Sequence, residues 1–159
     1  MNSYRPIVLA TDGSPSAGDA QRQAFDLAKA SHAPLLVVSV SHATVPAVGY
    51  SAYGYSEIVT ELTHAEHQRL DALLAEVTEA AAQEGIETTG VKADGAIVEE
   101  ICRIAEENQA QLIVVGSHGW GAARRFLSGS VSTGLVHSAP CPVLVVRRKP
   151  DGEHERAAA

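Results

Sequence analysis

At 159 residues, with 45% hydrophobic and 19% charged residues, the chain has the composition of one globular domain with its own core, which excludes a disordered protein. A formal net charge of −7 argues against broad binding to nucleic acid or to an anionic membrane, so neither is expected as a partner. No stretch approaches the roughly 20 apolar residues of a membrane span, and the N-terminal residues show no signal segment. Cys102 and Cys141 have no metal or redox spacing. We therefore expect a cytoplasmic protein with reduced cysteines.

The N-terminal part of the chain predicts a strand, a helix and a second strand. The apolar run from Pro6 to Thr11 predicts a central strand, because the strands of a parallel sheet are apolar on both faces. It ends at Asp12-Gly13. The next pair, Ser14-Pro15, predicts a helix with Ser14 as N-cap and Pro15 at the first helical position. The run from Leu35 to Val40 predicts the second strand.

A long irregular segment and a long helix come next. The segment from His42 to Tyr55 carries three tyrosines, which could cover a ligand or lie on the surface. Glu57 to Gln83 predicts an amphipathic helix that ends before Gly85. Its expected buried stripe consists of Ile58, Leu62, Ala65, Leu73, Val77 and Ala80. Two histidines of this helix, His64 and His67, are expected to be solvated rather than to bind a metal, because no third ligand is evident.

The C-terminal part predicts three further strands and two helices. Glu87 to Ala93 alternates weakly, as an edge strand does, and a helix with the apolar face Ile97, Ile101, Ile104 and Ala105 follows the turn Asp94-Gly95. The remaining elements are expected at Leu112 to Val115 (strand), Ser130 to Ser138 (helix) and Pro142 to Val146 (strand). We assign residues 1–148 to one domain and residues 149–159 to a frayed C-terminal tail.

Strands that alternate with helices predict an α/β fold, in which a parallel sheet is covered by helices on both faces. In such sheets ligands bind beyond the carboxyl ends of the strands, where the strand order reverses. Two strand ends are chemically distinctive, namely Asp12-Gly13 after the first strand and residues 116–119 after the fourth. If these strands are neighbours, a carboxylate and a glycine loop face one cleft.

The segment from Leu112 to Ser130, LIVVGSHGWGAARRFLSGS, reads as a strand, a glycine-rich connection and a helix start. Glycine lets main-chain N–H groups approach a ligand, and a helix start adds unpaired N–H groups and a positive dipole end. Together they favour an anion, most naturally phosphate. The spacing is neither that of a P-loop nor G-x-G-x-x-G. An ordinary strand-to-helix loop that needs glycines to turn is the alternative.

The spacing Gly116-x-x-Gly119, nine residues, then Gly129-Ser130 resembles the G-2x-G-9x-G-(S/T) motif of the universal stress protein family in its nucleotide-binding branch. The resemblance extends over nearly the whole chain. It includes the opening PIVLATDGS, the stretch DGAIVEEI from Asp94 to Ile101, the loop GSHG, the helix start GSVS and the stretch APCPVLVVR from Ala139 to Arg147. It implies one three-layer α/β/α domain of the adenine nucleotide alpha hydrolase-like, Rossmann-like kind, with strand order 3-2-1-4-5, that binds ATP.

The resemblance also implies which residues contact the nucleotide. They would lie at the base and ribose (Ala10, Asp12, Val40, Val115 and Gly116), beneath the phosphates (His118 and Gly119) and around the phosphates at the helix start (Gly129, Ser130, Val131 and Ser132). Asp12 is expected near the ribose or a bound metal, since a carboxylate oxygen suits Mg²⁺ or Mn²⁺ accompanying a nucleotide. It could instead serve only as a turn residue in Asp-Gly.

No convincing reaction machinery is evident. The motif contains no lysine, and phosphoryl transfer needs a positioned base and strong charge clamps. We therefore expect a regulatory or stress-response protein with at most slow ATP hydrolysis. An ATPase or nucleotidyl-transfer enzyme using the same cleft and a dimeric interaction module that binds no nucleotide remain alternatives. The apolar strand Pro142 to Val146 is expected at a sheet edge and predicts a homodimer, and family members resemble this in pairing through that strand.

Overall fold

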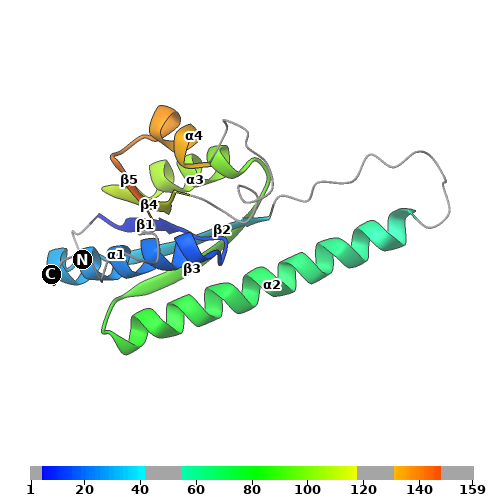
Figure 1. Ribbon diagram of the computed structural model, residues 1–159, viewed down its shortest axis with the longest axis horizontal. Helices are drawn as coiled ribbons and strands as arrows, with labels where there is room; N and C mark the ends of the chain where they lie inside the picture. Colours follow the sequence, from blue (N-terminus) through cyan, green and yellow to red (C-terminus); the bar gives the residue numbers. More distant parts are fainter. Residues whose placement is uncertain (1–4, 42–54, 118–130, 148–159) are drawn as a thin grey trace, which may run out of the picture.

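The computed structural model describes residues 5–41, 55–117 and 131–147. In these residues, five parallel strands form one sheet in the order β3-β2-β1-β4-β5, with helices on both faces (Figure 1). In chain order the elements are β1 (Ile7–Ala10), α1 (Pro15–Ser31), β2 (Leu35–Ser41), α2 (Tyr55–Gln83), β3 (Thr88–Asp94), α3 (Ile97–Glu107), β4 (Leu112–Gly116), α4 (Val131–Ser138) and β5 (Val143–Val146). The predicted fold class and strand order are confirmed.

The element boundaries differ from the predicted ones by one or two residues. Strand β1 ends at Ala10 rather than Thr11, while β2 continues to Ser41 and β4 to Gly116. Tyr55, expected in the irregular segment, begins α2. The other two tyrosines of that segment and the expected tail at 149–159 lie outside the described residues.

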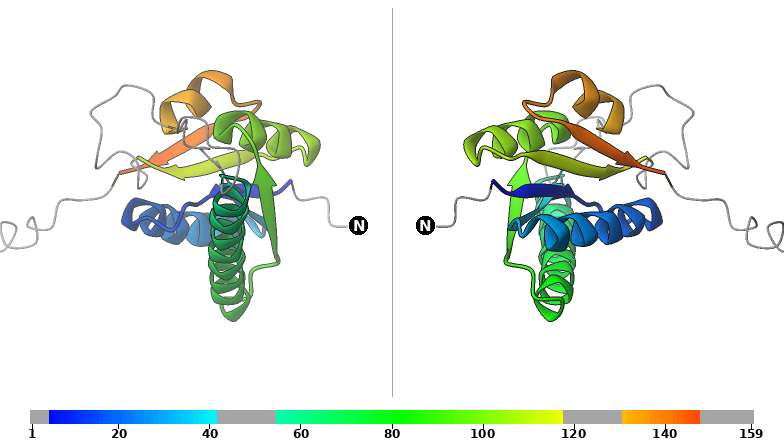
Figure 2. Two further views of the ribbon diagram at one scale, coloured as in Figure 1. Left: turned by 90° about the vertical axis from the view of Figure 1, so that its right-hand side faces the viewer. Right: turned by 90° about the vertical axis from the view of Figure 1, so that its left-hand side faces the viewer.

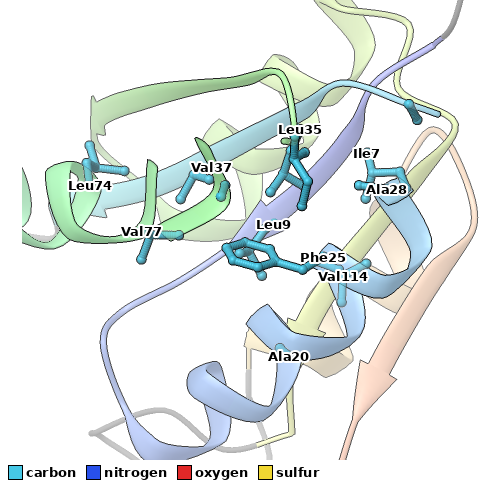
Figure 3. Close-up of a cluster of buried hydrophobic side chains, with 14 residues drawn as sticks. Ile7, Leu9, Ala20, Phe25, Ala28, Leu35, Val37, Leu74, Val77 and Val114 are labelled. Carbon is cyan, nitrogen blue, oxygen red and sulfur yellow. The ribbon is translucent and has the colours of Figure 1, made fainter. Parts of the chain in front are cut away.

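The helices form two layers, with α1 and α2 on one face of the sheet and α3 and α4 on the other (Figure 2). Each layer encloses its own apolar cluster. The first gathers side chains of α1, α2 and the strands, including Phe25, Leu9 and Val77 (Figure 3). The second joins Ile101, Ile104 and Ala105 of α3, as predicted, to Leu135 of α4 and to the opposite face of the strands. Both faces of the three central strands, β2, β1 and β4, are therefore largely buried.

The start of α1 is as predicted. Pro15 is its first residue, and the Ser14 hydroxyl oxygen accepts a hydrogen bond from the main-chain N–H of Ala17 at 3.2 Å. A Ser side chain in this role satisfies one of the N–H groups that a helix start leaves without an acceptor. The cap matters for the site because Asp12 and Gly13 immediately precede it.

The predicted buried stripe of α2 is wrong in its first half. Leu62 is 56% exposed and Ala65 is exposed, whereas Leu70, Leu74, Val77 and Ala81 are buried. The reason is length, because 29 helical residues extend about 43 Å and seven-residue strands such as β2 span only about 23 Å. The N-terminal turns of α2 therefore project past the sheet (Figure 1). Leu73 and Ala80 are partly buried, as expected, and the side chain of Ile58 is outside the described part.

Within the described ranges, no helix is long and apolar enough to cross a bilayer.

Candidate functional site

The carboxyl ends of β1 and β4 are neighbours. The two strands pair in parallel with Ala10 opposite Val115, so Asp12 and Ser117, each two residues further on, follow adjacent strand ends. From β1 the chain proceeds to β2 and β3 on one side, and it then returns to β4 on the other. The strand order thus reverses between β1 and β4, which is where open α/β sheets form their ligand crevices. The predicted adjacency is confirmed.

Four of the predicted site residues belong to the apolar cluster on the α3/α4 face. They come from four different elements and are Ala10 (β1), Val40 (β2), Val115 (β4) and Val131 (α4). Ala10 and Val115 are each 6% exposed, and Val40 and Val131 are half-buried. At the carboxyl edge of three adjacent strands, this arrangement offers an apolar surface of the kind on which a planar base can lie.

Asp12 is half-buried and organises the turn that follows β1. Its Oδ1 accepts a hydrogen bond from the main-chain N–H of Ser14 at 2.9 Å. Gly13 adopts φ +78°, a left-handed conformation that glycine takes without steric cost. The turn role that the sequence left open is therefore present.

Gly116 has a packing role that the motif does not reveal. A Cβ atom placed on this residue would lie 2.6 Å from Oγ of Ser16 and 2.7 Å from its main-chain oxygen. Glycine is needed here because the first turn of α1 lies directly against the end of β4. This contact fixes the helix that begins after Asp12 against the strand that leads into the glycine loop.

Helix α4 starts at the carboxyl edge of the sheet, because it leads back to the amino end of the parallel strand β5. The first N–H groups of an α-helix have no acceptor within the helix and carry its positive dipole end. Ser132 in this first turn is 7% exposed. These features suit a phosphate group. The other predicted phosphate-site residues, His118, Gly119, Gly129 and Ser130, lie outside the described residues.

A cation from the opposite layer reaches the same turn. Arg69 of α2 donates from Nη1 to the main-chain oxygen of Asp12 at 3.2 Å, and its other nitrogens donate to both carboxylate oxygens of Glu66 at 2.9 Å. The hydrogen bond to Glu66 raises the pKa of Arg69, although partial desolvation lowers it. The negative charges of Glu66 and Asp12 raise it further. The same hydrogen bond lowers the pKa of Glu66.

Sequence reasoning missed both Arg69 and Ser16. Arg69 is one of several charged residues on a helix and shares no motif with Asp12, from which it is 57 positions distant. Ser16 is an ordinary first-turn residue of α1. Their contacts depend on how helices pack on the sheet, and no local pattern specifies that.

The two histidines of α2 pair with neighbouring side chains. Nε2 of His67 lies 2.7 Å from Oδ1 of Asp94, and Nε2 of His64 lies 3.0 Å from Nε2 of Gln68. Among the residues that the structure describes, no group of three or more His, Cys, Asp or Glu side chains is placed to hold a metal ion. Burial raises the pKa of the Cys102 and Cys141 thiols, both of which are free, and this disfavours their reactive thiolate form.

Comparisons with known proteins agree with this fold. The model of the universal stress protein family matches residues 3–147. A universal stress protein of Methanocaldococcus jannaschii is 35% identical over 147 residues, which cover 92% of this chain and 84% of that protein. A solved universal stress protein in complex with cAMP has a TM-score of 0.65 and 25% identity over 92% of this chain and 98% of its own. One from Archaeoglobus fulgidus in complex with dAMP has a TM-score of 0.59 and 25% identity over 90% and 98%.

Proposed function

This chain belongs to the universal stress protein family, and on that premise we propose that it binds ATP at the carboxyl edge of its sheet and acts as a regulatory or stress-response protein. The base would lie against Ala10, Val40 and Val115. The phosphates would extend to the start of α4 at Val131 and Ser132, with the segment that contains His118, Gly119, Gly129 and Ser130 completing their site.

One observation carries the proposal. The switch point between β1 and β4 brings together an apolar surface, the Asp12 carboxylate and the amino end of α4, which are the three features that a base, a ribose or metal, and a phosphate require. Relatives of the same fold that were solved with dAMP or cAMP support an adenine nucleotide as the ligand class. Within that class we propose ATP because the spacing of Gly116, Gly119, Gly129 and Ser130 resembles that of the nucleotide-binding branch of the family.

Asp12 is the residue that would hold a magnesium or manganese ion with the nucleotide. Mg²⁺ commonly takes one or two protein carboxylates and completes its octahedron with phosphate oxygens and water. A single half-buried carboxylate beside the phosphate site fits that pattern. The ion would neutralise phosphate charge when bound.

We further propose that hydrolysis is at most slow. The motif between Gly116 and Ser130 contains no lysine, whereas phosphoryl transfer needs a positioned base and strong charge clamps around the transferred phosphate. An ATPase or nucleotidyl-transfer enzyme is thus the weaker candidate. Release of phosphate at a single-turnover rate above about 1 per second, in the range of typical enzymes, would favour it. A non-binding dimeric module is the other alternative.

Replacing Gly129 by Val tests the proposal. The branched side chain should occupy phosphate space and abolish ATP binding in titration calorimetry, while circular dichroism stays that of the wild type. Gly18→Val is the matched control, because a Cβ at Gly18 meets nothing within 4 Å. It should bind ATP as the wild type does. Equal ATP affinity in the Gly129→Val variant would remove this residue from the site.

We also propose a cytoplasmic location, with residues 1–148 as the functional domain.

A further inference from the structure

Helix α2 contacts the carboxyl edge of the sheet from the face opposite to the proposed nucleotide. Three of its side chains, spaced two residues apart, reach the carboxyl ends of strands. His67 lies 2.7 Å from Asp94 at the end of β3, Arg69 donates to the main chain of Asp12 beyond β1, and Asp71 lies 2.6 Å from Nζ of Lys92 in β3. Leu70 between them is 1% exposed and anchors the helix on the sheet. This part of α2 is therefore held in a defined register.

The contact of Arg69 with the β1–α1 turn is built from several sides. Glu66 holds the guanidinium through two hydrogen bonds of 2.9 Å, so that its remaining nitrogen, Nη1, is aimed at the Asp12 carbonyl. A Cβ on Gly13 would lie 3.4 Å from the Leu73 side chain and 3.9 Å from Nη1 of Arg69, so α2 also borders the turn at Gly13. The Arg69–Glu66 pair is bidentate, and a bidentate Arg–carboxylate pair holds the guanidinium in a specific orientation.

The turn that Arg69 holds also sets the direction of the Asp12 carboxylate. Its Oδ1 is fixed by the Ser14 N–H, and Ser14 in turn caps α1. The main-chain oxygen of Asp12 is fixed by Arg69. Because its main-chain oxygen and its Oδ1 are both hydrogen-bonded, Asp12 is restricted before any ligand arrives. Such pre-organisation strengthens binding, because less conformational entropy is lost when the ligand binds.

We infer that Arg69 is a positioning residue for nucleotide binding, which holds the Asp12 main chain from helix α2 so that the carboxylate meets the ribose or its metal ion. This inference rests on the proposed function, because it assigns a supporting residue to the same crevice. Glu66 orients the guanidinium of Arg69 and therefore supports the same contact with Asp12.

The first test needs no ligand. Arg69→Met keeps the length of the side chain and removes its donors, and in the ligand-free protein it should speed amide exchange of Gly13 and Ser14 at least threefold, as measured by NMR. Arg103→Met is the matched control. Arg103 pairs with Glu100 and Glu107 on α3 much as Arg69 pairs with Glu66, and it should leave both amides unchanged. Unchanged exchange in Arg69→Met would overturn the inference.

The second test measures ATP affinity by titration calorimetry, with and without magnesium. Arg69→Met should weaken binding about fivefold to tenfold, because the Asp12 turn, no longer held by Arg69, must then be ordered when the nucleotide binds. Arg69→Lys should recover part of the loss, Glu66→Gln should lie between, and Arg103→Met should bind as the wild type does. In an Asp12→Ala background, which removes the side chain that Arg69 positions, Arg69→Met should weaken binding no further, because Arg69 acts through Asp12.

The outcomes separate the two proposals. Wild-type protein that binds ATP while Arg69→Met binds equally well overturns the role of Arg69 and leaves the proposed function standing. A loss that is equally large in the Asp12→Ala background shows that Arg69 acts by another route and also overturns the inference. Wild-type protein that binds no adenine nucleotide overturns the proposed function and this inference with it, while the exchange measurement still reports whether Arg69 holds the turn.

Discussion

Two serines on the same face of β2 have different surroundings. Ser39 and Ser41 are each 1% exposed and, by the two-residue period of a strand, share the side of Leu35 and Val37. The Ser39 hydroxyl donates to the Thr11 carbonyl at 2.8 Å. The Ser41 hydroxyl has no hydrogen-bond partner within the described part of the chain. The first links β2 to the segment that leads into Asp12.

This difference predicts different effects of the same substitution on the free energy of unfolding. Ser39→Ala should lower the free energy of unfolding by about 1–3 kcal/mol, because it leaves the buried Thr11 carbonyl without this donor. Ser41→Ala should leave it unchanged or raise it by up to about 1 kcal/mol. Urea denaturation followed by circular dichroism measures both. An equal loss in the two variants would mean that Ser41 has a partner and would contradict this prediction.

At this scale, local chemistry could be predicted and packing could not. Ser14 and Pro15 were correctly assigned to the start of α1, because capping depends on neighbours in sequence. The requirement for glycine at position 116 comes instead from Ser16, across the α1–β4 contact. Whether Gly129 and Ser130 hold phosphate, and whether Asp12 does more than shape its turn, remain predictions.

The projecting half of α2 shows how an element can be correctly identified while its buried face is wrong. Helical periodicity predicted one stripe along the whole helix, but a stripe is buried only where another layer covers it. The sheet covers α2 around Leu70 and Leu74, and the turn containing Leu62 lies outside this region.

A matched pair of leucines in α2 tests this description. Leu70→Ala should lower the free energy of unfolding by about 2–5 kcal/mol, as core truncations do. Leu62→Ala should change it by less than about 0.5 kcal/mol, because the side chain is 56% exposed. Thermal and urea unfolding of both variants provide the measurement. A large loss for Leu62→Ala would show that another surface covers this part of the helix in solution.

At the scale of the whole molecule, we predict self-association through an edge of the sheet. Strand β5 lies at one edge of the sheet, and all four of its residues are half-buried. On neighbouring α4, Val136 is 59% exposed. An apolar edge strand favours pairing with a second copy, and a two-fold dimer closes such an edge. The homodimer through residues 142–146 therefore stays our prediction.

Sedimentation velocity at several micromolar concentrations tests the dimer. The wild type should sediment at twice the monomer mass of 16.7 kDa. Val146→Lys should shift it toward the monomer, since it places a charge at the proposed contact. Thr89→Lys, on the opposite edge strand β3, is the control and should remain dimeric. Wild-type protein that stays monomeric at high micromolar concentration would count against the dimer.

The architecture could be predicted at this scale because alternating strands and helices permit few arrangements. The resemblance supplied the strand order, and with it the adjacency of Asp12 and the glycine loop. The hydrogen bond between Arg69 of α2 and the main-chain oxygen of Asp12 could not be predicted, since the two residues share no motif and meet only in the folded chain.

The most direct measurement is a crystal structure of the protein grown with excess ATP and magnesium. The account predicts the base against Ala10, Val40 and Val115, the phosphates at the start of α4, and Asp12 beside the ribose or the metal ion. A crevice that is empty at saturating nucleotide, or closed by the protein's own side chains, would contradict it.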